Sequence, residues 1–521
     1  AGSQVGSKFQ VPRSMVKVRK CRGARRINLE LPMTLSQDES PSPRRKRWLS
    51  LSVASLATLL VTADTGQLSI ALPVIINEFN ADLTLASWIA LVYALITASL
   101  YLPCGRLSDV VGIGKVFMAG FILYGAGALA AGWSQGAEQL ILFRAFQAAG
   151  SALIMANNFA LVTALFPPEE RGRAMGISGG TVSALGYTLG PVLGGFLTYA
   201  FGWRSNLYLS AVLAFLGMAA ARYLLPPESF KGSSAKKEPF DFSGAITFAL
   251  SISLFLLALA TAQKGSWRSS LFGVELLGAM VVMLLFVGLE KRARFPLLDL
   301  TLFRIPAFTL GNTARWISFV TMSINVLLMP FFLQLGMRLD PLQAGFLVVP
   351  TPFAMALLAP LTGWMSERFL PERLCSLGLI INAVAFLCLS LLSVQTTAFT
   401  VIIWLSVLGL GMGLFQTPNN NLLMSSLPRQ RLGVGSSFLA IVRSLGNSVG
   451  AALAATIVSA HFVGETERWS LQSLWTDLGT EARAPLLAAF LQGFHYTYLM
   501  AAALCLVGAA VSAVRVSGRR R

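Results

Sequence analysis

The sequence has little charge, little histidine and no pattern among its cysteines. Only 12% of its 521 residues are charged, against about 25% in soluble domains, and 23 acids face 41 Lys or Arg. In a soluble protein the net charge of +18 would indicate a nucleic-acid partner. With 55% hydrophobic residues, however, too few charges remain to cover a water-facing surface, so we expect a membrane protein and no nucleic acid.

The five cysteines show no CxxC spacing and the two histidines are isolated, which argues against a disulfide scaffold and a zinc site. No metal or cofactor is expected. The apolar residues from Trp48 onward form fourteen runs, each long enough to span a ~30 Å hydrocarbon core. These predicted spans lie near 48–76, 84–104, 115–133, 139–165, 172–200, 205–225, 242–262, 271–290, 308–335, 343–366, 374–394, 398–424, 434–461 and 486–515.

The basic residues predict the orientation of these spans. With the N-terminus inside, the tails and inward loops hold 32 of the 41 basic residues, the outward loops hold six, and three lie within spans. Because cytoplasmic loops are enriched in Lys and Arg, both termini are expected to be cytoplasmic, with the chain in the cell (inner) membrane. Residues 1–47, with twelve basic residues, are predicted to be a disordered cytoplasmic tail, and 516–521 a second short tail.

A weak internal repeat divides the spans into halves. The loop GRLSDVVG from Gly105 and the loop GWMSERFL from Gly363 lie 258 residues apart, and this offset carries Asp109 onto Glu367. Residues 48–225 and 308–515 are therefore predicted to form two six-helix bundles, joined by a linker, 226–307, with two extra spans. Repeated halves are typical of transporters, with the substrate site between them at mid-membrane.

Several motifs make a family resemblance specific. The first span contains ADTGQLSIALP, the fourth RAFQAAGSA and the fifth GYTLGPVLGG, and DFSGA follows at 241–245. With these motifs, residues 48–515 resemble the fourteen-span drug:proton antiporter branch of the major facilitator superfamily. The resemblance implies an all-α fold of two six-helix bundles plus two inserted helices, and alternating access driven by proton influx. It implies a transporter and no enzyme activity.

Asp64 and Arg144 are the candidates for proton coupling. Asp64 lies about 12 residues, or ~18 Å, from the outer end of its span, where a carboxylate needs a partner, a proton or water. Arg144 enters from the outer side of span 4 and is long enough to reach that level. In the resembled family this Arg is implicated in coupling. The alternatives are a structural hydrogen-bonding role for Asp64 and a snorkelling Arg144 that anchors its helix end.

Two glycine-containing motifs are candidates for packing and gating. Small residues at GxxxG spacing permit close helix approach, and we expect a tight, bendable contact between the halves from Gly186, Gly190, Pro191, Gly194 and Gly195. The loops of the repeat are expected to form a cytoplasmic latch, with Gly105 as a further packing candidate; the latch residues are Arg106, Asp109, Lys115, Glu367 and Arg368. This latch is expected to be weaker than in the family, because Val110 and Ile113 stand where the family usually has Arg.

Arg315 and Arg443 lie at equal depth, about eight residues or ~12 Å from the cytoplasmic ends of spans 9 and 13. They are predicted to form a cationic subsite of the substrate cavity, with snorkelling toward the cytoplasm as the alternative. With Asp64 as the clear buried acid, the pair favours neutral or anionic amphiphiles over cationic dyes. Further cavity hydrogen-bonders are predicted at Gln67, Gln334, Gln416, Asn419 and Asn420.

We therefore expect a monomeric secondary active transporter in the lipid bilayer that exports amphipathic or lipophilic small molecules in exchange for protons. The alternative on the same scaffold is an exporter or flippase of an anionic lipid or lipid precursor. A membrane enzyme would need clustered acids or histidines at a membrane face, and a channel would need repeated pore loops. Neither pattern is found in the sequence.

Overall fold

The structure is a computed structural model that describes residues 44–79, 83–232, 240–263, 269–339, 341–461 and 480–518. Most of the predicted N-terminal tail, residues 1–43, and the last three residues of the C-terminal tail lie outside the described residues. The first helix begins at Arg44, four residues before the predicted first span.

Every regular element in the described ranges is helical. In chain order they are α1 (Arg44–Phe79), α2 (Leu83–Val111), α3 (Ile113–Gly132), α4 (Ala137–Leu165), α5 (Pro168–Met175), η1 (Gly176–Val182), α6 (Ser183–Phe201), α7 (Arg204–Leu224), η2 (Pro227–Phe230), α8 (Phe242–Gln263), α9 (Ser270–Arg292), η3 (Leu300–Arg304), α10 (Pro306–Phe331), η4 (Phe332–Gly336), α11 (Pro341–Val348), α12 (Pro350–Arg368), α13 (Pro371–Ser390), α14 (Ala398–Ser425), η5 (Arg429–Arg431), α15 (Leu432–Ala460) and α16 (Thr480–Gly518). The predicted all-α multi-pass membrane class is confirmed.

Thirteen helical segments in the described part of the chain are long and apolar enough to cross a membrane. The remaining predicted span, 172–200, corresponds to α5, η1 and α6, which follow one another without a break from Pro168 to Phe201. This run is rich in glycine, which adds length without adding apolar surface. Its middle, η1, is a π-helical turn of sequence GISGGTV.

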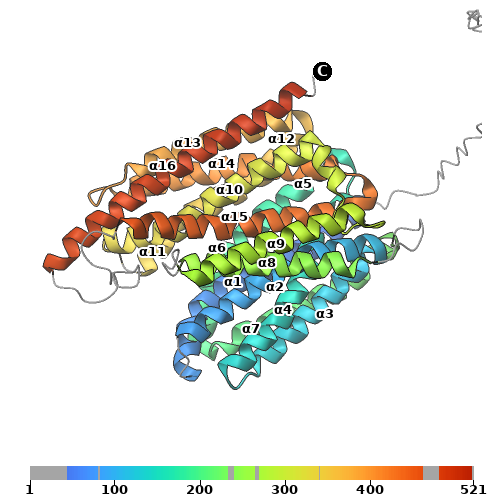
Figure 1. Cartoon of the computed structure of the whole chain (residues 1–521), viewed down its shortest axis with the longest axis horizontal. Helices are drawn as coiled ribbons and strands as arrows, with labels where there is room; N and C mark the ends of the chain where they lie inside the picture. The colour runs from blue at the N-terminus through green and yellow to red at the C-terminus, as the bar shows by residue number, and fades with distance from the viewer. Residues whose placement is uncertain are drawn as a thin grey trace, which may run out of the picture. The chain divides into compact units, whose positions relative to one another are not determined.

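The helices form two sets, which we call the N-terminal bundle (α1–α7) and the C-terminal bundle (α10–α16) (Figure 1). In the N-terminal bundle α1 packs on α6 and α7, and α4 packs on α2 and α3. In the C-terminal bundle α10 packs on α15 and α16, and α13 packs on α14 and α16. The division at 48–225 and 308–515 expected from the repeat stays a prediction.

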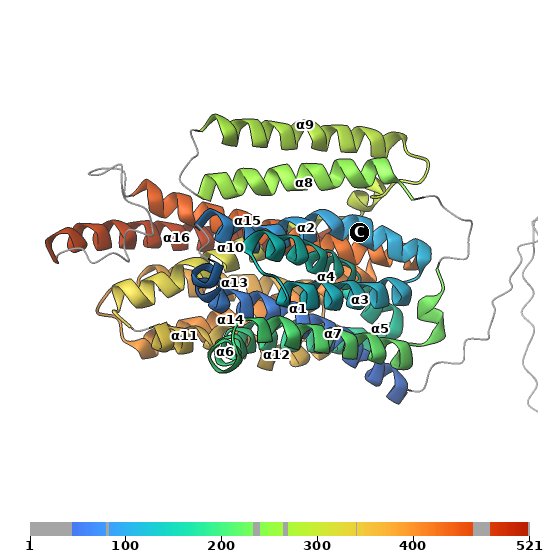
Figure 2. The same cartoon turned by 90° about the horizontal axis from the view of Figure 1, so that it is seen from below.

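The inserted helices α8 and α9 form an antiparallel pair beside the bundles (Figure 2). Helix α8 packs on α2 and α15, so it touches both bundles, while α9 packs on α8. The outer side of α9 exposes large apolar side chains, including Val274 at 68% and Leu284 at 71%. An apolar face of this extent suits the hydrocarbon of the bilayer and would be a liability in water.

The two bundles meet through helices related by the repeat. Helix α2 packs on α15, α5 and η1 pack on α12, and α4 also packs on α15. At the first contact, a Cβ on Gly105 would lie 2.5 Å from the carbonyl oxygen of Gly433. At the second, a Cβ on Gly172 would lie 2.6 Å from the carbonyl oxygen of Gly363. Glycine at these positions lets the backbones of the two bundles touch.

Candidate functional site

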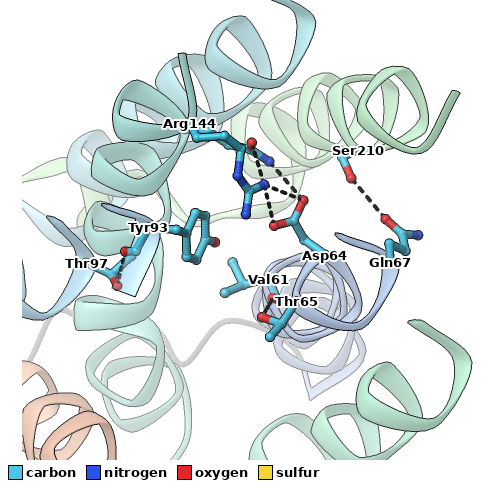
Figure 3. A network of polar contacts seen from close by, with 9 residues as sticks. Val61, Asp64, Thr65, Gln67, Tyr93, Thr97, Arg144 and Ser210 are labelled. Atoms are coloured by element: carbon cyan, nitrogen blue, oxygen red, sulfur yellow. Dashed lines mark hydrogen bonds and ion pairs between the residues drawn. The ribbon is translucent and has the colours of Figure 1, made fainter. Parts of the chain in front are cut away.

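A carboxylate and a guanidinium are paired inside the N-terminal bundle (Figure 3). Asp64 lies in α1, Arg144 lies in α4, and each is only 2% exposed. Arg144 Nη1 donates to Asp64 Oδ2 at 2.9 Å and to Asp64 Oδ1 at 3.2 Å. The two residues that the sequence proposed for proton coupling are therefore in direct contact.

Two further residues complete the surroundings of this pair. Gln147 Nε2 donates to Asp64 Oδ1 at 3.0 Å, and its Oε1 accepts from Arg144 Nη1 at 2.9 Å. The Arg144 guanidinium lies over the ring of Tyr93, 4.5 Å from its centroid (Figure 3). The sequence analysis did not nominate Gln147 or Tyr93 for coupling. The Arg-x-x-Gln spacing was a signal for Gln147, because residues three apart share one face of a helix.

This arrangement pairs a carboxylate with a guanidinium in a place that is buried from water. Burial disfavours the ionised form of an acid, while a cation and hydrogen-bond donors at contact distance favour it. Removing either charge of a buried pair leaves the other uncompensated, at a cost of about 3–5 kcal/mol. A movement that separates Asp64 from Arg144 would therefore leave each group without its partner of opposite charge.

A third buried charge, Arg315, belongs to the C-terminal bundle, whereas Asp64 and Arg144 belong to the N-terminal bundle. It lies in α10 and is 2% exposed. Its Nε donates to the carbonyl oxygen of Leu439 at 3.1 Å, and its Nη1 donates to Asn420 Oδ1. Its guanidinium also lies near two phenyl rings, 4.9 Å from the centroid of Phe319 and 5.9 Å from that of Phe159. Phe159 belongs to α4, so Arg315 reaches the N-terminal bundle.

Arg443 is half-buried in α15, one helical turn beyond the Leu439 carbonyl that holds Arg315. It is close enough to Arg315 for the two positive charges to repel. Its other electrostatic neighbours are the phenol groups of Tyr101, Tyr187 and Tyr93, all of which belong to the N-terminal bundle. Of the two arginines that the sequence grouped by depth, Arg315 therefore bonds α15 one helical turn before Arg443.

The amide side chains predicted to line a cavity lie in different places. Gln67 is buried in α1 and accepts from Ser210 Oγ of α7 at 3.4 Å, within the N-terminal bundle (Figure 3). Asn419 Nδ2 donates to the carbonyl oxygen of Gly311 at 3.2 Å. Asn420 accepts from Arg315, Gln416 is buried in α14, and Gln334 is half-buried in η4. Of these five amides, Asn420 is the one shown to bond Arg315, and substrate contact by all five stays a prediction.

The predicted latch residues connect the bundles through helix ends. Asp109 of α2 accepts from the backbone N–H of Gly433 at 2.8 Å and of Val434 at 3.1 Å, in the first turn of α15. Its partner in the repeat, Glu367 of α12, accepts from the backbone N–H of Arg173 in α5 at 2.8 Å. Each bundle therefore places one carboxylate on the backbone of the other.

The contact of Asp109 with the N-terminus of α15 does not depend on the arginines missing from the loop. A carboxylate at a helix N-terminus satisfies backbone N–H groups and the helix dipole, and neither effect needs Arg at positions 110 or 113. Arg368, expected in the same latch, lies over the ring of Trp364 in its own helix α12, 4.3 Å from the centroid. The prediction that the latch is weaker than in the family stays a prediction.

The glycine stripe of α6 faces a helix of its own bundle, although α6 also packs on α12 of the other bundle, and a contact of the stripe between the halves stays a prediction. Its partner is α1, which belongs to the same bundle. A Cβ on Gly190 would lie 2.5 Å from the Ala63 carbonyl oxygen, and one on Gly194 would lie 2.6 Å from the Gln67 Cα. Gly186 packs in the same way on Thr62.

The two other residues of the stripe differ from these three glycines. The ring of Pro191 lies against α1 at Gly66, where a Cβ would come within 2.5 Å of the proline Cδ. A Cβ on Gly195 would find only an ordinary contact, 3.7 Å from Ile70 Cγ2. Spacing predicts that a helix is approached closely but does not say by which neighbour, because several helices surround each one in a bundle. The role of the stripe in gating stays a prediction.

The described residues contain no group of three or more His, Cys, Asp or Glu side chains arranged to hold a metal ion. The polar contacts described above are the ion pair of Asp64 and Arg144, the bonds of Arg315, and the backbone contacts of the Asp109 and Glu367 carboxylates. Such groups can bind, exchange protons and change partners.

Comparison with known proteins gives one family match. Residues 54–451 match the model of the Major Facilitator Superfamily. The riboflavin transporter RibZ of Clostridioides difficile is 29% identical over 468 residues, which cover 89% of this chain and 96% of that protein. The multidrug efflux pump LfrA of Mycolicibacterium smegmatis is 28% identical over 433 residues, covering 82% and 85%.

Solved structures show the same fold. The proton:xylose symporter XylE superposes with a TM-score of 0.61 at 14% identity, covering 89% of this chain and 95% of that one. The human organic anion transporter MFSD10 superposes with a TM-score of 0.60 at 15% identity, covering 90% and 100%. At these identities the likeness concerns the arrangement of helices.

Proposed function

Because this chain belongs to the major facilitator superfamily, it is a multi-pass membrane transporter and not an enzyme, and we propose that it exports amphipathic small molecules in exchange for protons. The family match confirms the resemblance drawn from the motifs, and the multidrug efflux pumps among the relatives support the export of drug-like molecules. The observation that carries the proton part of the proposal is the buried pair of Asp64 and Arg144.

The proposed cycle uses that pair as a proton switch. In the state described here the Asp64 carboxyl accepts hydrogen bonds from Arg144 and Gln147. When the bundles rock and the interior opens to the outside, water and substrate change the surroundings of the pair, and Asp64 takes up a proton. Return to the inward-open state releases that proton to the cytoplasm, and the proton gradient drives the cycle in the export direction.

The orientation in the membrane belongs to the same proposal. We propose that both termini and the latch residues Asp109 and Glu367 face the cytoplasm, because the basic residues gather in the loops on that side. The state described here, with both carboxylates bonded across the bundles, would then be closed to the cytoplasm. We also propose that one chain is sufficient for transport.

The test is the variant Asp64→Asn in proteoliposomes with an imposed pH gradient. Asparagine keeps an acceptor for Arg144 but cannot ionise, so we expect gradient-driven accumulation of substrate to be lost while downhill exchange of substrate continues. A matched control is Glu275→Gln, which removes a carboxyl that accepts from Thr261 Oγ1 at 2.8 Å within the inserted helix pair. That control is expected to transport like the wild type.

Two outcomes separate the role of the proton from a role in folding. If Asp64→Asn is unstable because Arg144 is left uncompensated, the double variant with Arg144→Gln removes both charges and restores the balance. The double variant is then expected to fold and to exchange substrate without coupling. Uphill export by the Asp64→Asn protein at the wild-type rate would show that Asp64 is not the proton carrier.

A further inference from the structure

We propose that Arg315 and Arg443 together bind an anionic group, a carboxylate or a phosphate, of an amphipathic substrate at the contact between the bundles. The proposal rests on the transport function proposed above and specifies its substrate class. Its basis is a pair of like charges that no acid of the described residues is shown to neutralise, with aromatic side chains beside them.

Arg315 donates hydrogen bonds to neutral groups, and no carboxylate of the described residues is shown to pair with its positive charge. Its donors go to a backbone carbonyl of Leu439 and to the neutral amide of Asn420, and its faces lie near phenyl rings. Neutral acceptors and rings offset only part of the cost of burying a guanidinium. A charge kept inside a membrane protein at this cost marks a place where a ligand or ion is handled.

Arg443 is a second positive charge, and its electrostatic repulsion with Arg315 is unfavourable. It follows Leu439 by one turn of α15, so the carbonyl that holds Arg315 sets the spacing of the pair. The electrostatic partners of Arg443 include the phenols of Tyr101 and Tyr187, which are neutral at ordinary pH. The buried carboxyl of Asp64 already bonds Arg144 and Gln147. An anion between the two arginines would remove the repulsion and pair both charges.

The side chains around the pair favour an amphipathic anion over a small inorganic one. Phe319 and Phe159 present rings to the Arg315 guanidinium, and Tyr101 and Tyr187 lie near Arg443. Rings beside cations suit a ligand that carries its charge on an aromatic or apolar body. The carboxylate or phosphate would bind the arginines, and the body would lie along the rings.

The same geometry links the ligand to both the rocking of the bundles and the proton pair. The arginines belong to α10 and α15, while Phe159, Tyr101 and Tyr187 belong to α4, α2 and α6. A ligand held by both sets therefore binds differently when the bundles move, which is the condition for coupling. The Arg144 guanidinium lies over the ring of Tyr93, and the phenol of Tyr93 also contributes to the electrostatic field at Arg443.

The experiment compares an aromatic anion with an aromatic cation on the full-length protein in proteoliposomes. The probes are fluorescein, which carries a carboxylate, and ethidium, and a third arm follows NBD-labelled phosphatidylglycerol between the leaflets. We expect Arg315→Gln and Arg443→Gln each to raise the KM for the anionic probe about tenfold, with the KM for ethidium unchanged or lowered. Arg443→Lys, which keeps the charge, is expected to retain most of the anion affinity.

The control is Arg292→Gln, which removes an exposed arginine at the end of α9, and it is expected to leave both KM values unchanged. Movement of fluorescein without the lipid identifies a soluble amphiphile, and movement of the lipid alone identifies a head group. A wild type that moves ethidium but neither anion overturns the proposal. So do Gln variants that change the anion and the cation equally, since that pattern marks a structural role.

Direct binding separates this proposal from the proton mechanism. Fluorescence anisotropy of fluorescein with the purified protein measures the site without any gradient, and the dissociation constant is expected to rise about tenfold in each Gln variant. If Asp64→Asn keeps uphill export while the Gln variants lose anion binding, the proton role fails and the anion site stands. If neither Gln variant changes fluorescein binding, or if the wild type binds none, the anion site is wrong.

Discussion

Replacing Asp109 with alanine is expected to weaken the contact between α2 and α15, and so to favour the state in which the two bundles are open at this end. The carboxylate accepts from the N–H groups of Gly433 and Val434, the second and third residues of α15, and so serves as an N-cap supplied by another bundle. Loss of an N-cap costs about 0.5–2 kcal/mol, and a carboxylate at a helix N-terminus adds about 0.3–1 kcal/mol. In the open state water replaces both partners, so the loss falls on the closed state.

A cost of about 1–2 kcal/mol shifts the balance toward the open state about 5- to 30-fold. Cys104 is a natural reporter, because it lies beside Gly105 where α2 touches α15 and is only 7% exposed. In a protein whose other cysteines are replaced by alanine, N-ethylmaleimide should label Cys104 at a rate set by the open population. We expect the rate in the Asp109→Ala variant to rise by the same 5- to 30-fold.

The control removes a cap that stays within one element. Asp299 Oδ1 accepts from the N–H of Thr301 at 3.0 Å and caps the short helix η3, without reaching the other bundle. Asp299→Ala should leave the labelling of Cys104 unchanged. A folded Asp109→Ala protein that labels at the wild-type rate would refute the latch, because the two hydrogen bonds would then contribute nothing to closure.

Gly190→Ala is expected to destabilise the protein by about 1–3 kcal/mol in thermal unfolding, because its Cβ would lie 2.5 Å from the Ala63 carbonyl oxygen, and Gly195→Ala should be neutral. At the end of α1, hydrogen bonds from Arg204 and Trp203 hold the pKa of Glu78 below its ordinary value of 4.5. This half-exposed contact contributes about 0.2–1 kcal/mol that is full at neutral pH and lost as the pH falls through the lowered pKa. The stability advantage over Glu78→Gln should therefore vanish in acid, and an advantage independent of pH would contradict the assignment.

The fold was largely readable from the sequence because the membrane permits few solutions. Long apolar runs must become helices, since only a helix satisfies its own backbone in hydrocarbon. The run 172–200 shows the limit of hydropathy, because its glycines make it less apolar while a close contact with neighbouring helices requires them. The offset of 258 residues paired Asp109 with Glu367, and the structure gives both the same task.

The candidate site was readable only in part. Asp64, Arg144, Arg315 and Arg443 stand out because ionised groups inside spans are rare and costly. Their partners do not stand out, because an amide such as Gln147 or a phenol such as Tyr93 is common in membrane helices and gains meaning only from what it touches.

The sequence by itself determined the class of protein, the spans and the repeat. It also identified the four ionisable groups within spans that are named above. The tertiary structure decided which groups meet: that Asp64 bonds Arg144, that Asp109 caps α15, and that the α6 glycines pack on α1. The physical reason is that local sequence fixes a helix and the depth of each side chain along it. The side chain meets its partner only when the surrounding helices are packed, and those helices come from distant parts of the chain.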